Sequence, residues 1–311
     1  MKHISKEIIE RISMKEAIDA MRLAFTVITN NETNLPQRIN MNTGAKDANI
    51  LIMPSSAFGI TGVKISSLYK NNPSRNLPMT QGLMVIINNE TGEPVAMIDA
   101  VYLTELRTGA ASGLATELLS RKDSKTLGIF GSNEQAEMQI EGVTEVRNIN
   151  KIFVFARNKE KTIEFCKKIS AKTGIQIIPA ENADNLKSCD IICTATNSCE
   201  PVFEHQYVKP GTHINAIGSY KPTCREIPGE TIIKSKLIVD QMKAALAEAG
   251  DILIPLSEGL INSNHIYAEL GEIVSGKKTG RTSNDEITVF KSVGIAVQDL
   301  ALAKLVLNKF I

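Results

Sequence analysis

The sequence predicts an α/β protein that combines a doubly wound parallel sheet with a smaller α+β domain. In Leu127–Gln139 an apolar run ends in a glycine-containing turn and resumes with helical spacing, which is typical of a strand, a turn and a helix N-terminus. From Thr126 onward, strand-like and helix-like segments alternate, which implies a parallel sheet with right-handed crossovers. Between residues 50 and 98, short strand-like runs joined by turns predict a largely antiparallel sheet.

Length and composition narrow the class of protein. At 311 residues the chain can form two domains, which we place at 1–112 with 295–311 and at 113–294. A net charge of +1 argues against nucleic acid or an anionic membrane as the main partner. No stretch resembles a signal peptide or a membrane span, so we expect a cytoplasmic protein. The five cysteines include no CxxC pair, so neither a disulfide framework nor a metal site is expected.

The N-terminal domain is predicted to begin with a helix and continue as a sheet. Ser13 and Glu16 fit a capping box, and apolar residues follow at helical spacing as far as Ile28. The expected strands are Ile50–Met53, Gly62–Ser66, Leu83–Ile87 and Val95–Ile98. A helix over Leu103–Leu119 is rich in Gly, Ala and Ser, which lets another element approach closely.

The turn after Leu127–Phe130 resembles a dinucleotide-binding fingerprint of the Rossmann type. Its three small positions fall on Gly131, Asn133 and Ala136, with Ser132 between the first two. Free N–H groups at the following helix N-terminus suit a pyrophosphate. Because Asn tolerates the left-handed backbone region, we expect the turn to form despite the missing second glycine. The alternative is an ordinary strand-to-helix turn.

The next strand, Lys151–Ala156, bears on the choice of cofactor. An NAD-binding domain places an acid about 20 residues past the turn, for the ribose 2′-hydroxyl. Here the strand is followed by Arg157, Asn158 and Lys159. An arginine at this place suits a 2′-phosphate, so we expect NADP(H) to be preferred and NAD(H) to be possible. The alternative is a solvated basic loop.

Later strands should bring further residues to the same crevice. Ligands of doubly wound sheets bind outside the carboxyl ends of the strands. We therefore expect Thr194, Ala195 and Thr196, together with Ile217, Gly218, Ser219 and Tyr220, to lie near Gly131. The chain should end in an amphipathic helix that presents Ile295, Ala296, Leu300, Ala303 and Val306 to a core.

Three cations of the first domain lack neighbours that would explain them as surface charge. Arg38 follows Pro36, Lys64 interrupts an apolar strand, and Arg107 lies on a helix. A partly buried lysine can serve as acid or base, and an arginine can bind a carboxylate with two hydrogen bonds. Together they suit a substrate that bears a carboxylate, with Thr80 and Thr108 as further hydroxyls. The alternative for Lys64 is an outward-facing lysine on a period-2 strand.

The motifs of the whole chain resemble those of the ornithine cyclodeaminase and mu-crystallin family. The resemblance runs from about residue 13 to residue 308, in the same order. The motifs are LPQR at 35–38, MP at 53–54, GVKISS at 62–67, TGEPVAMIDA at 91–100, LTELRTGAAS at 103–112, GTHINAIGS at 211–219, AELGEIVSG at 268–276 and DEITVFKSVGIAVQDLALAK at 285–304.

This resemblance implies roles for individual residues. It implies a homodimer in which N-terminal domains pair through their sheets, each subunit adding a Rossmann-type domain. Arg38 would bind the substrate carboxylate and Lys64 would be the active-site lysine. The residues implied at the cofactor or substrate are Arg107 and Thr108, with Glu134 and Gln135 at the pyrophosphate turn and Ser292 and Val293 at the nicotinamide end.

Two departures separate this chain from true ornithine cyclodeaminases. Those proteins resemble one another in an acid just after the GG or GA that ends the HINAIG motif, and here the sequence GSYKP puts Tyr220 at that position. They also carry an acid two residues before the LMP-type motif, where this chain has Leu51. The resemblance therefore favours the members that reduce cyclic imines.

The function predicted from these points is reduction of a small cyclic α-imino acid, such as 1-pyrroline-2-carboxylate, to an amino acid such as L-proline. The pocket wall is expected to include Tyr69, Met79 and Tyr220. Alternatives are an alanine dehydrogenase, an ornithine cyclodeaminase with relocated acids, and a mu-crystallin-like protein that holds NADPH and a small ligand without turnover.

Overall fold

The computed structural model describes residues 1–310, so Ile311, the end of the predicted tail, lies outside the described residues. The chain divides into two compact units. Unit 1 comprises Met1–Arg107 and the described residues from Ile295, and unit 2 comprises Thr108–Gly294. One boundary falls within helix α3 (Ala100–Leu119), and the other follows Gly294, which has a left-handed backbone with φ of 78°.

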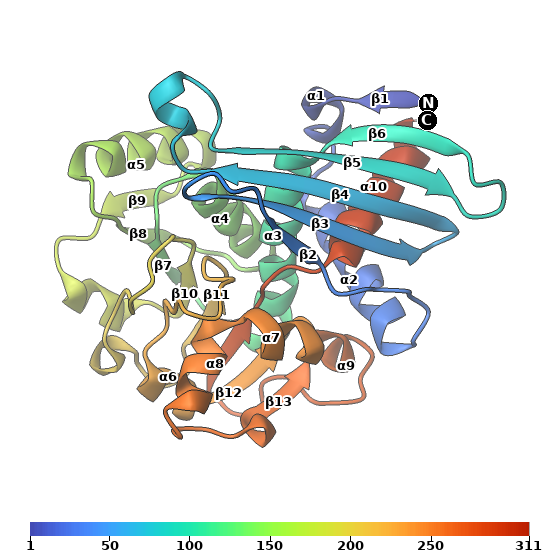
Figure 1. The fold of residues 1–311 in the computed structure, drawn as a ribbon. Coiled ribbons are helices and arrows are strands. Elements are labelled where there is room, and N and C mark those ends of the chain that lie inside the picture. The colour runs from blue at the N-terminus through green and yellow to red at the C-terminus, as the bar shows by residue number, and fades with distance from the viewer. Residues whose placement is uncertain (311) are drawn as a thin grey trace. The chain divides into compact units, whose positions relative to one another are not determined.

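Unit 1 is built on a mainly antiparallel sheet with strand order β1-β6-β5-β4-β3-β2 (Figure 1). Its strands are β1 (Lys2–Ile4), β2 (Ile39–Asn42), β3 (Ala48–Ala57), β4 (Ile60–Tyr69), β5 (Thr80–Asn88) and β6 (Pro94–Asp99). Neighbours from β2 to β6 pair antiparallel as predicted, while β1 pairs parallel with β6.

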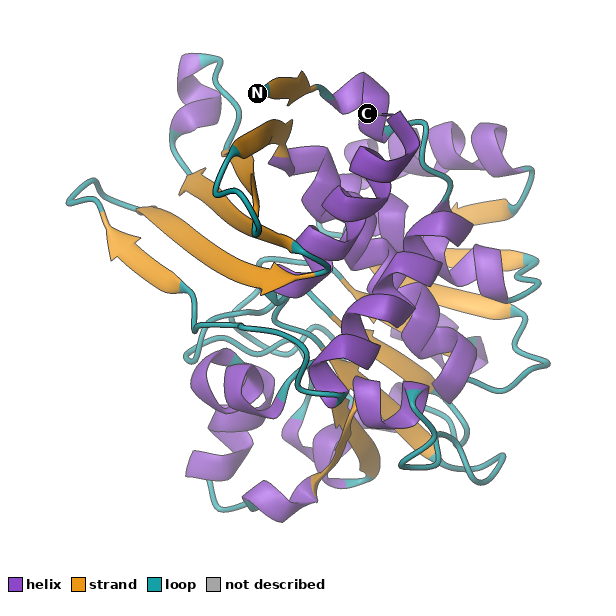
Figure 2. Ribbon diagram, turned by 90° about the vertical axis from the view of Figure 1, so that its right-hand side faces the viewer, coloured by secondary structure: helices purple, strands orange, loops and turns teal. Residues whose placement is uncertain are grey.

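Helices cover one face of this sheet (Figure 2). The helices that lie wholly in unit 1 are α1 (Lys6–Ile9), α2 (Met14–Thr29) and α10 (Ala296–Phe310), and a short 3-10 turn η1 (Asn72–Arg75) lies between β4 and β5. The predicted capping box is present, because Ser13 accepts from Glu16 N and Glu16 accepts from Ser13 N. Helix α10 packs on α2 and crosses β3 and β4.

The two faces of the unit 1 sheet carry different side chains. Directly paired residues of an antiparallel sheet lie on the same face. The row Met53, Lys64, Met84 and Ile98 is buried, since each of these residues is at most 3% exposed. One residue along, the row Ile39, Ile52, Ile65 and Leu83 lies on the opposite face, with Ile39 54% and Ile65 38% exposed.

Unit 2 contains a fully parallel sheet with strand order β13-β12-β14-β11-β10-β7-β8-β9, as expected for a doubly wound fold. Its strands are β7 (Thr126–Phe130), β8 (Lys151–Phe155), β9 (Gln176–Pro179), β10 (Ile191–Thr194), β11 (His213–Ala216), β12 (Ser235–Val239), β13 (Ile266–Glu269) and β14 (Ile287–Lys291). The sequence analysis did not predict β12, β13 or β14.

Helices and short turns connect these strands. They are α4 (Glu134–Val146), α5 (Lys159–Thr173), η2 (Ala183–Ser188), η3 (His205–Tyr207), α6 (Gly229–Ile233), α7 (Met242–Glu248), α8 (Gly250–Ser257), η4 (Ser263–His265) and α9 (Leu270–Val274). Both faces of the sheet are buried, because Ile191 and Cys193 of β10 pack in one apolar cluster while Ile192 packs in another. The small residues of α3 admit α4 closely, since a Cβ on Gly142 would lie 2.1 Å from the Gly109 carbonyl oxygen.

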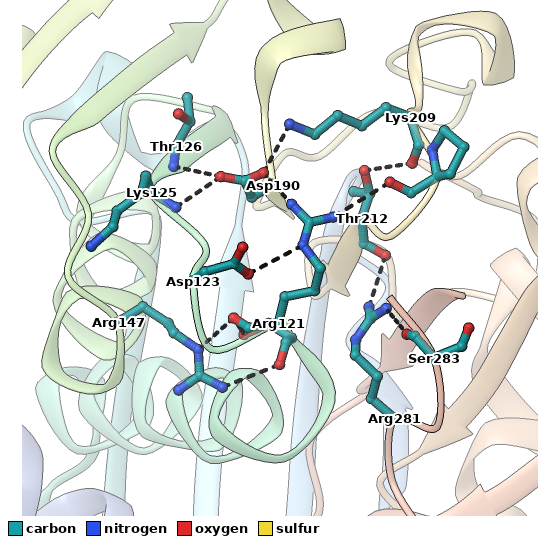
Figure 3. Close-up of polar contacts among 12 residues, drawn as sticks. Arg121, Asp123, Lys125, Thr126, Arg147, Asp190, Lys209, Thr212, Arg281 and Ser283 are labelled. Atoms are coloured by element: carbon teal, nitrogen blue, oxygen red, sulfur yellow. Dashed lines mark hydrogen bonds and ion pairs between the residues drawn. The ribbon is translucent and has the colours of Figure 1, made fainter. Parts of the chain in front are cut away.

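The amino edge of the parallel sheet is held by a polar network (Figure 3). Asp190, just before β10, accepts from Arg121 Nη2 at 2.6 Å and Lys209 Nζ at 2.8 Å, and from two backbone N–H groups at the start of β7. Arg147 donates to carbonyl groups at the C-terminus of α3, including that of Glu117 at 2.8 Å. These charges are internally paired, so this edge is structural.

Candidate functional site

The carboxyl edge of the unit 2 sheet contains the predicted phosphate turn. Strand β7 ends at Phe130, Gly131 follows with φ of 115°, and α4 begins at Glu134. A Cβ on Gly131 would lie 2.8 Å from the Ala195 carbonyl oxygen, so a side chain cannot be accommodated there. The glycine therefore brings the turn against the loop after β10.

Asn133 acts differently from the expectation. Its φ is −112°, which is not the left-handed region, so that part of the sequence reasoning was wrong. Its side chain instead caps α4 by accepting from Ala136 N at 2.9 Å, and its amide donates to the Ala195 carbonyl at 3.3 Å. Both ends of the side-chain amide are therefore hydrogen-bonded within the protein.

The residues at this turn fit an anionic dinucleotide. Helix N-termini offer backbone N–H groups to phosphate, and α4 has 13 residues over which its dipole accumulates. Gln135, in the first turn, has a buried Nε2 with no hydrogen-bond partner among the described residues. A buried donor of this kind is costly unless a ligand pairs with it. Ser132 is half-buried and Glu134 is exposed beside it.

The loops after β10 and β11 lie together at the same edge. A Cβ on Gly218 would fall 2.2 Å from the Thr196 carbonyl oxygen, so these two loops are in direct contact. Thr194, Ala195, Ile217 and Ser219 are buried, and Thr196, Gly218 and Tyr220 are half-buried. The two loops that carry these seven predicted residues therefore pack against each other through Thr196 and Gly218.

Asp240 organises the loop after β14. It follows β12 and is 1% exposed. Its Oδ2 accepts from Ser292 Oγ at 2.9 Å, from Val293 N at 2.8 Å and from Gly294 N at 2.8 Å. Ser292, which the sequence placed at the nicotinamide, is thus held by a carboxylate that the sequence reasoning missed.

The end of β8 carries the residues that bear on the 2′-phosphate. Arg157 is exposed just after the strand. Asn158 caps α5 by accepting from Lys161 N at 3.0 Å. Arg157 is therefore the residue of this pair whose side chain is placed to meet solvent or a ligand.

Unit 1 gathers the three predicted cations. Lys64 is 1% exposed, which excludes the outward-facing alternative. Its Nζ lies 2.8 Å from Asp299 Oδ2 and 3.1 Å from Thr104 Oγ1. Thr104 donates its own hydroxyl to Ala100 O at 2.6 Å, so it accepts from Lys64. An ammonium has three donors, and no third acceptor contacts Lys64 among residues 1–310.

Asp299 is shared between two cations. Arg107 Nε donates to Asp299 Oδ1 at 3.2 Å, while Lys64 uses the other oxygen. Arg107 Nη1 also donates to Gln298 Oε1 at 2.8 Å. Thr104 lies in the matched motif at 103–112, and Gln298 and Asp299 lie in the one at 285–304, but none of the three was singled out because their contacts with Lys64 and Arg107 form only in the fold. The nearest signal was the QD pair within the last matched motif.

Electrostatics in this cluster favour an anionic ligand. Burial lowers the pKa of Lys64 to about 8, the negative charge of Asp299 opposes this, and the positive charges of Arg107 and Arg38 add to it. Arg38, half-buried in the loop before β2, is therefore within electrostatic reach of Lys64. Lys64 and Arg107 both pair with the single carboxylate of Asp299, so two cations meet one carboxylate.

The remaining predicted residues are more dispersed. Thr80 is exposed at the start of β5, Tyr69 is half-buried at the end of β4, and Met79 is 41% exposed. Thr108 and Val293 are buried at 6% and 7% exposure in unit 2. No helix of residues 1–310 is long and apolar enough to cross a membrane.

The cysteine spacing indicated no disulfide framework, but one disulfide is present. Cys199 and Cys224 form a disulfide across 25 residues of sequence, joining the loop after β10 to the loop after β11. Without a CxxC spacing, this pairing depends on how the two loops fold back on each other. Cys166, Cys189 and Cys193 are free and buried.

Known proteins resemble this chain over its whole length. A model of the ornithine cyclodeaminase/mu-crystallin family matches residues 1–311. The Delta(1)-pyrroline-2-carboxylate reductase of Bacillus thuringiensis subsp. konkukian is 40% identical over 302 residues, covering 96% of this chain and 93% of that protein. Thermococcus litoralis Delta(1)-pyrroline-2-carboxylate reductase, solved with NADH and L-proline, is 42% identical with a TM-score of 0.96, covering 99% and 97% of the two chains. An archaeal alanine dehydrogenase dimer with bound NAD is 33% identical with a TM-score of 0.93, covering 100% and 97%.

Proposed function

Because this chain belongs to the ornithine cyclodeaminase/mu-crystallin family, we propose that it is an NAD(P)H-dependent reductase of a small cyclic α-imino acid. The family and the α/β fold class predicted from the sequence are confirmed. The proposed substrate is 1-pyrroline-2-carboxylate, and the product is L-proline. The observation that carries the proposal is the buried Lys64, which shares the carboxylate of Asp299 with Arg107 and lies within electrostatic reach of Arg38.

The cation cluster performs two tasks in this reaction. A bound reduced nicotinamide cofactor supplies the hydride that reaches the imine carbon. Arg38 and Lys64 bind the substrate carboxylate and orient the ring. With its pKa near 8, Lys64 is largely protonated at neutral pH, so it can also provide a proton at the ring nitrogen, directly or through water.

The assignment to imine reduction also uses what this chain lacks at two positions. A cyclic imine already contains the ring, so its reduction requires no carboxylate to handle a departing amine. Tyr220 and Leu51 stand where true ornithine cyclodeaminases resemble one another in acids. These residues support a reductase over a cyclodeaminase.

A substrate panel followed at the NAD(P)H absorbance band tests the function. We expect rapid oxidation of the cofactor with 1-pyrroline-2-carboxylate and formation of L-proline. Faster turnover of pyruvate with ammonia would instead identify an alanine dehydrogenase, and release of ammonia from ornithine a cyclodeaminase. Cofactor binding without turnover of any of these compounds would favour a binding protein.

For the cofactor, we propose that NADP(H) binds more tightly than NAD(H). Arg157 is exposed at the end of β8, and the residues 156–159 include no carboxylate. Loss of charge-assisted bonds to a phosphate costs roughly 1.5–3 kcal/mol, or about tenfold to a hundredfold in affinity. Fluorescence titration of both cofactors measures this. Arg157→Ala should weaken the binding of NADPH and leave the affinity for NADH unchanged. Equal affinities of the wild type for the two cofactors would contradict the preference.

For the assembly, we propose a homodimer that covers the open face of the unit 1 sheet. The row Ile39, Ile52, Ile65 and Leu83 exposes apolar side chains that a second copy would bury. Light scattering of Ile65→Glu should show monomers. The control is Leu23→Glu on α2, where Leu23 is 59% exposed but lies outside this row, and it should remain dimeric. A wild-type monomer at micromolar concentration would refute the proposal.

A further inference from the structure

Glu226 is a buried carboxylate that sequence reasoning did not single out. It lies in the loop between β11 and α6 and is 0% exposed. Its Oε1 accepts from Thr196 N at 2.8 Å and from Thr196 Oγ1 at 2.7 Å. Its Oε2 accepts from Thr194 Oγ1 at 2.9 Å and from Ser219 N at 3.1 Å. One side chain therefore joins the end of β10 to the end of β11.

The backbone of Glu226 is itself fixed by buried charges. Asp251 Oδ1 accepts from Glu226 N at 2.7 Å and from Ile227 N at 2.9 Å. Asp251 Oδ2 lies 2.8 Å from Lys291 Nζ at the end of β14, and Lys291 also donates to the Ser219 carbonyl. The network is closed, because it starts and ends at Ser219. It links the ends of three neighbouring strands.

Burial of the Glu226 carboxylate next to a second carboxylate, that of Asp251, costs free energy. Burial and the negative charge of Asp251 raise the pKa of Glu226, while Lys291 and the hydrogen bonds from Thr196 oppose this. A buried carboxylate is costly unless its oxygens are fully hydrogen-bonded. An apolar side chain in this space would avoid that cost. The glutamate is therefore explained by the loops after β10 and β11, which it holds in place.

These loops are the surface where doubly wound sheets bind ligands. A Cβ on Gly218 would lie 2.2 Å from the Thr196 carbonyl oxygen and 2.7 Å from Glu226 Oε1, so Gly218 packs directly against both residues. Ala195, between Thr194 and Thr196, accepts from the Asn133 amide at 3.3 Å and so meets the phosphate turn. A shift in the loop after β10 would therefore also move the phosphate turn at Gly131, whose backbone packs against the Ala195 carbonyl.

We propose that Glu226 is a positioning residue of the cofactor site, which holds the ends of β10 and β11 in the arrangement that accepts the nicotinamide cofactor. This inference rests on the proposed function. Glu226 is buried and acts through Thr194, Thr196 and Ser219, so it is not itself a cofactor ligand.

Glu226→Gln is the informative change because it keeps the shape and alters the hydrogen bonding. An amide has one oxygen and one NH2 group, whereas the carboxylate accepts at both oxygens. Whichever way the amide turns, its NH2 group faces a backbone N–H, either that of Thr196 or that of Ser219. The hydroxyls can rotate, but the backbone donors cannot.

Asp190 offers a matched control on the same sheet. Like Glu226, it is a buried carboxylate with four donors, here Arg121, Lys209 and the backbone N–H groups of Lys125 and Thr126 (Figure 3). It stands at the amino edge, away from the loops at the carboxyl ends of the strands. Asp190→Asn should thus weaken the fold without changing those loops.

The test compares both variants with the wild type in three measurements. These are the Kd for NADH and NADPH by fluorescence, amide hydrogen exchange at 194–198 and 217–221 without cofactor, and urea unfolding. For Glu226→Gln we expect a Kd at least tenfold higher, faster exchange in both loops, and a KM for the imine that changes much less than the KM for the cofactor. For Asp190→Asn we expect lower stability with a Kd within about twofold of the wild type, a difference of under about 0.5 kcal/mol.

Other results would overturn the inference. An unchanged Kd in Glu226→Gln, or an equal rise in both variants, would make Glu226 a general stabilising residue. If Glu226→Gln does not fold, Thr194→Val removes one of the four donors at a position that is 0% exposed. It should raise the Kd about twofold to tenfold, as loss of one hydrogen bond implies, and an unchanged Kd would again refute the inference. A wild type that binds neither cofactor would defeat the proposed function as well.

Discussion

Residues 1–310 contain two buried lysine–aspartate pairs, one in each unit. In unit 1, Lys64 Nζ lies 2.8 Å from Asp299 Oδ2, and in unit 2, Lys291 Nζ lies 2.8 Å from Asp251 Oδ2. Both lysines are at most 1% exposed. By distance and burial alone the pairs are equivalent, so these two criteria cannot tell a reactive lysine from a structural one.

Their surroundings differ. Lys291 also donates to the Ser219 carbonyl, and Asp251 accepts two backbone N–H groups, so this pair is satisfied by the fold around it. Lys64 shares Asp299 with Arg107, so two cations meet one carboxylate. The unit 1 cluster therefore has a surplus of positive charge that an anionic substrate can balance. Charge balance, rather than burial, separates the two roles.

The largest expected effect is on turnover. Lys64→Met should reduce kcat/KM for the imine by about 10²–10⁴-fold, the usual contribution of a general acid, and by more if the carboxylate contact is also lost. Cofactor affinity should remain near the wild-type value, because Lys64 lies in unit 1 and the phosphate turn in unit 2. Steady-state rates and cofactor titration measure both. If Lys64→Met folds and keeps more than about a tenth of the wild-type kcat/KM, then Lys64 is a structural lysine and not a catalytic one.

The second effect is on the free energy of unfolding. It should be larger when the Lys291–Asp251 pair is broken than when the Lys64–Asp299 pair is broken. Lys291→Met leaves Asp251 buried without a cation, which typically costs about 3–5 kcal/mol. Lys64→Met should cost less, because Asp299 keeps its contact with Arg107 at 3.2 Å. Urea unfolding of the two variants side by side gives the difference. Equal losses would mean that Arg107 does not compensate Asp299.

A smaller effect is expected from Asp299→Asn, through the acidity of Lys64. The negative charge of Asp299 and its hydrogen bond both raise the pKa of Lys64 against the lowering effect of burial. Their removal should lower that pKa further, so less Lys64 is protonated at neutral pH. The ratio of the rate at pH 8 to the rate at pH 6 should therefore fall below that of the wild type. An unchanged ratio would show that Asp299 does not control Lys64.

The sequence was sufficient for the fold class and the family but not for the contacts of the site. Strand alternation placed Lys64 on one face of β4 and Ile65 on the other, yet which face is covered depends on α10, far along the chain. Asp299 reaches Lys64 through that packing, so local pattern could not reveal it. The same holds for Glu226, whose partners Thr194 and Ser219 meet it through the folding of two loops.

The pH dependence of kcat/KM for 1-pyrroline-2-carboxylate tests the central claim that protonated Lys64 serves the reaction. A lysine is protonated below its pKa, so kcat/KM should be highest below pH 8 and fall as the pH rises through about 8. Lys64→Met, measured in parallel, controls for titration of the imine itself. Its residual kcat/KM should not show this fall near pH 8. A wild-type profile that stays flat from about pH 7 to pH 9, or a limb that persists in Lys64→Met, would contradict the claim.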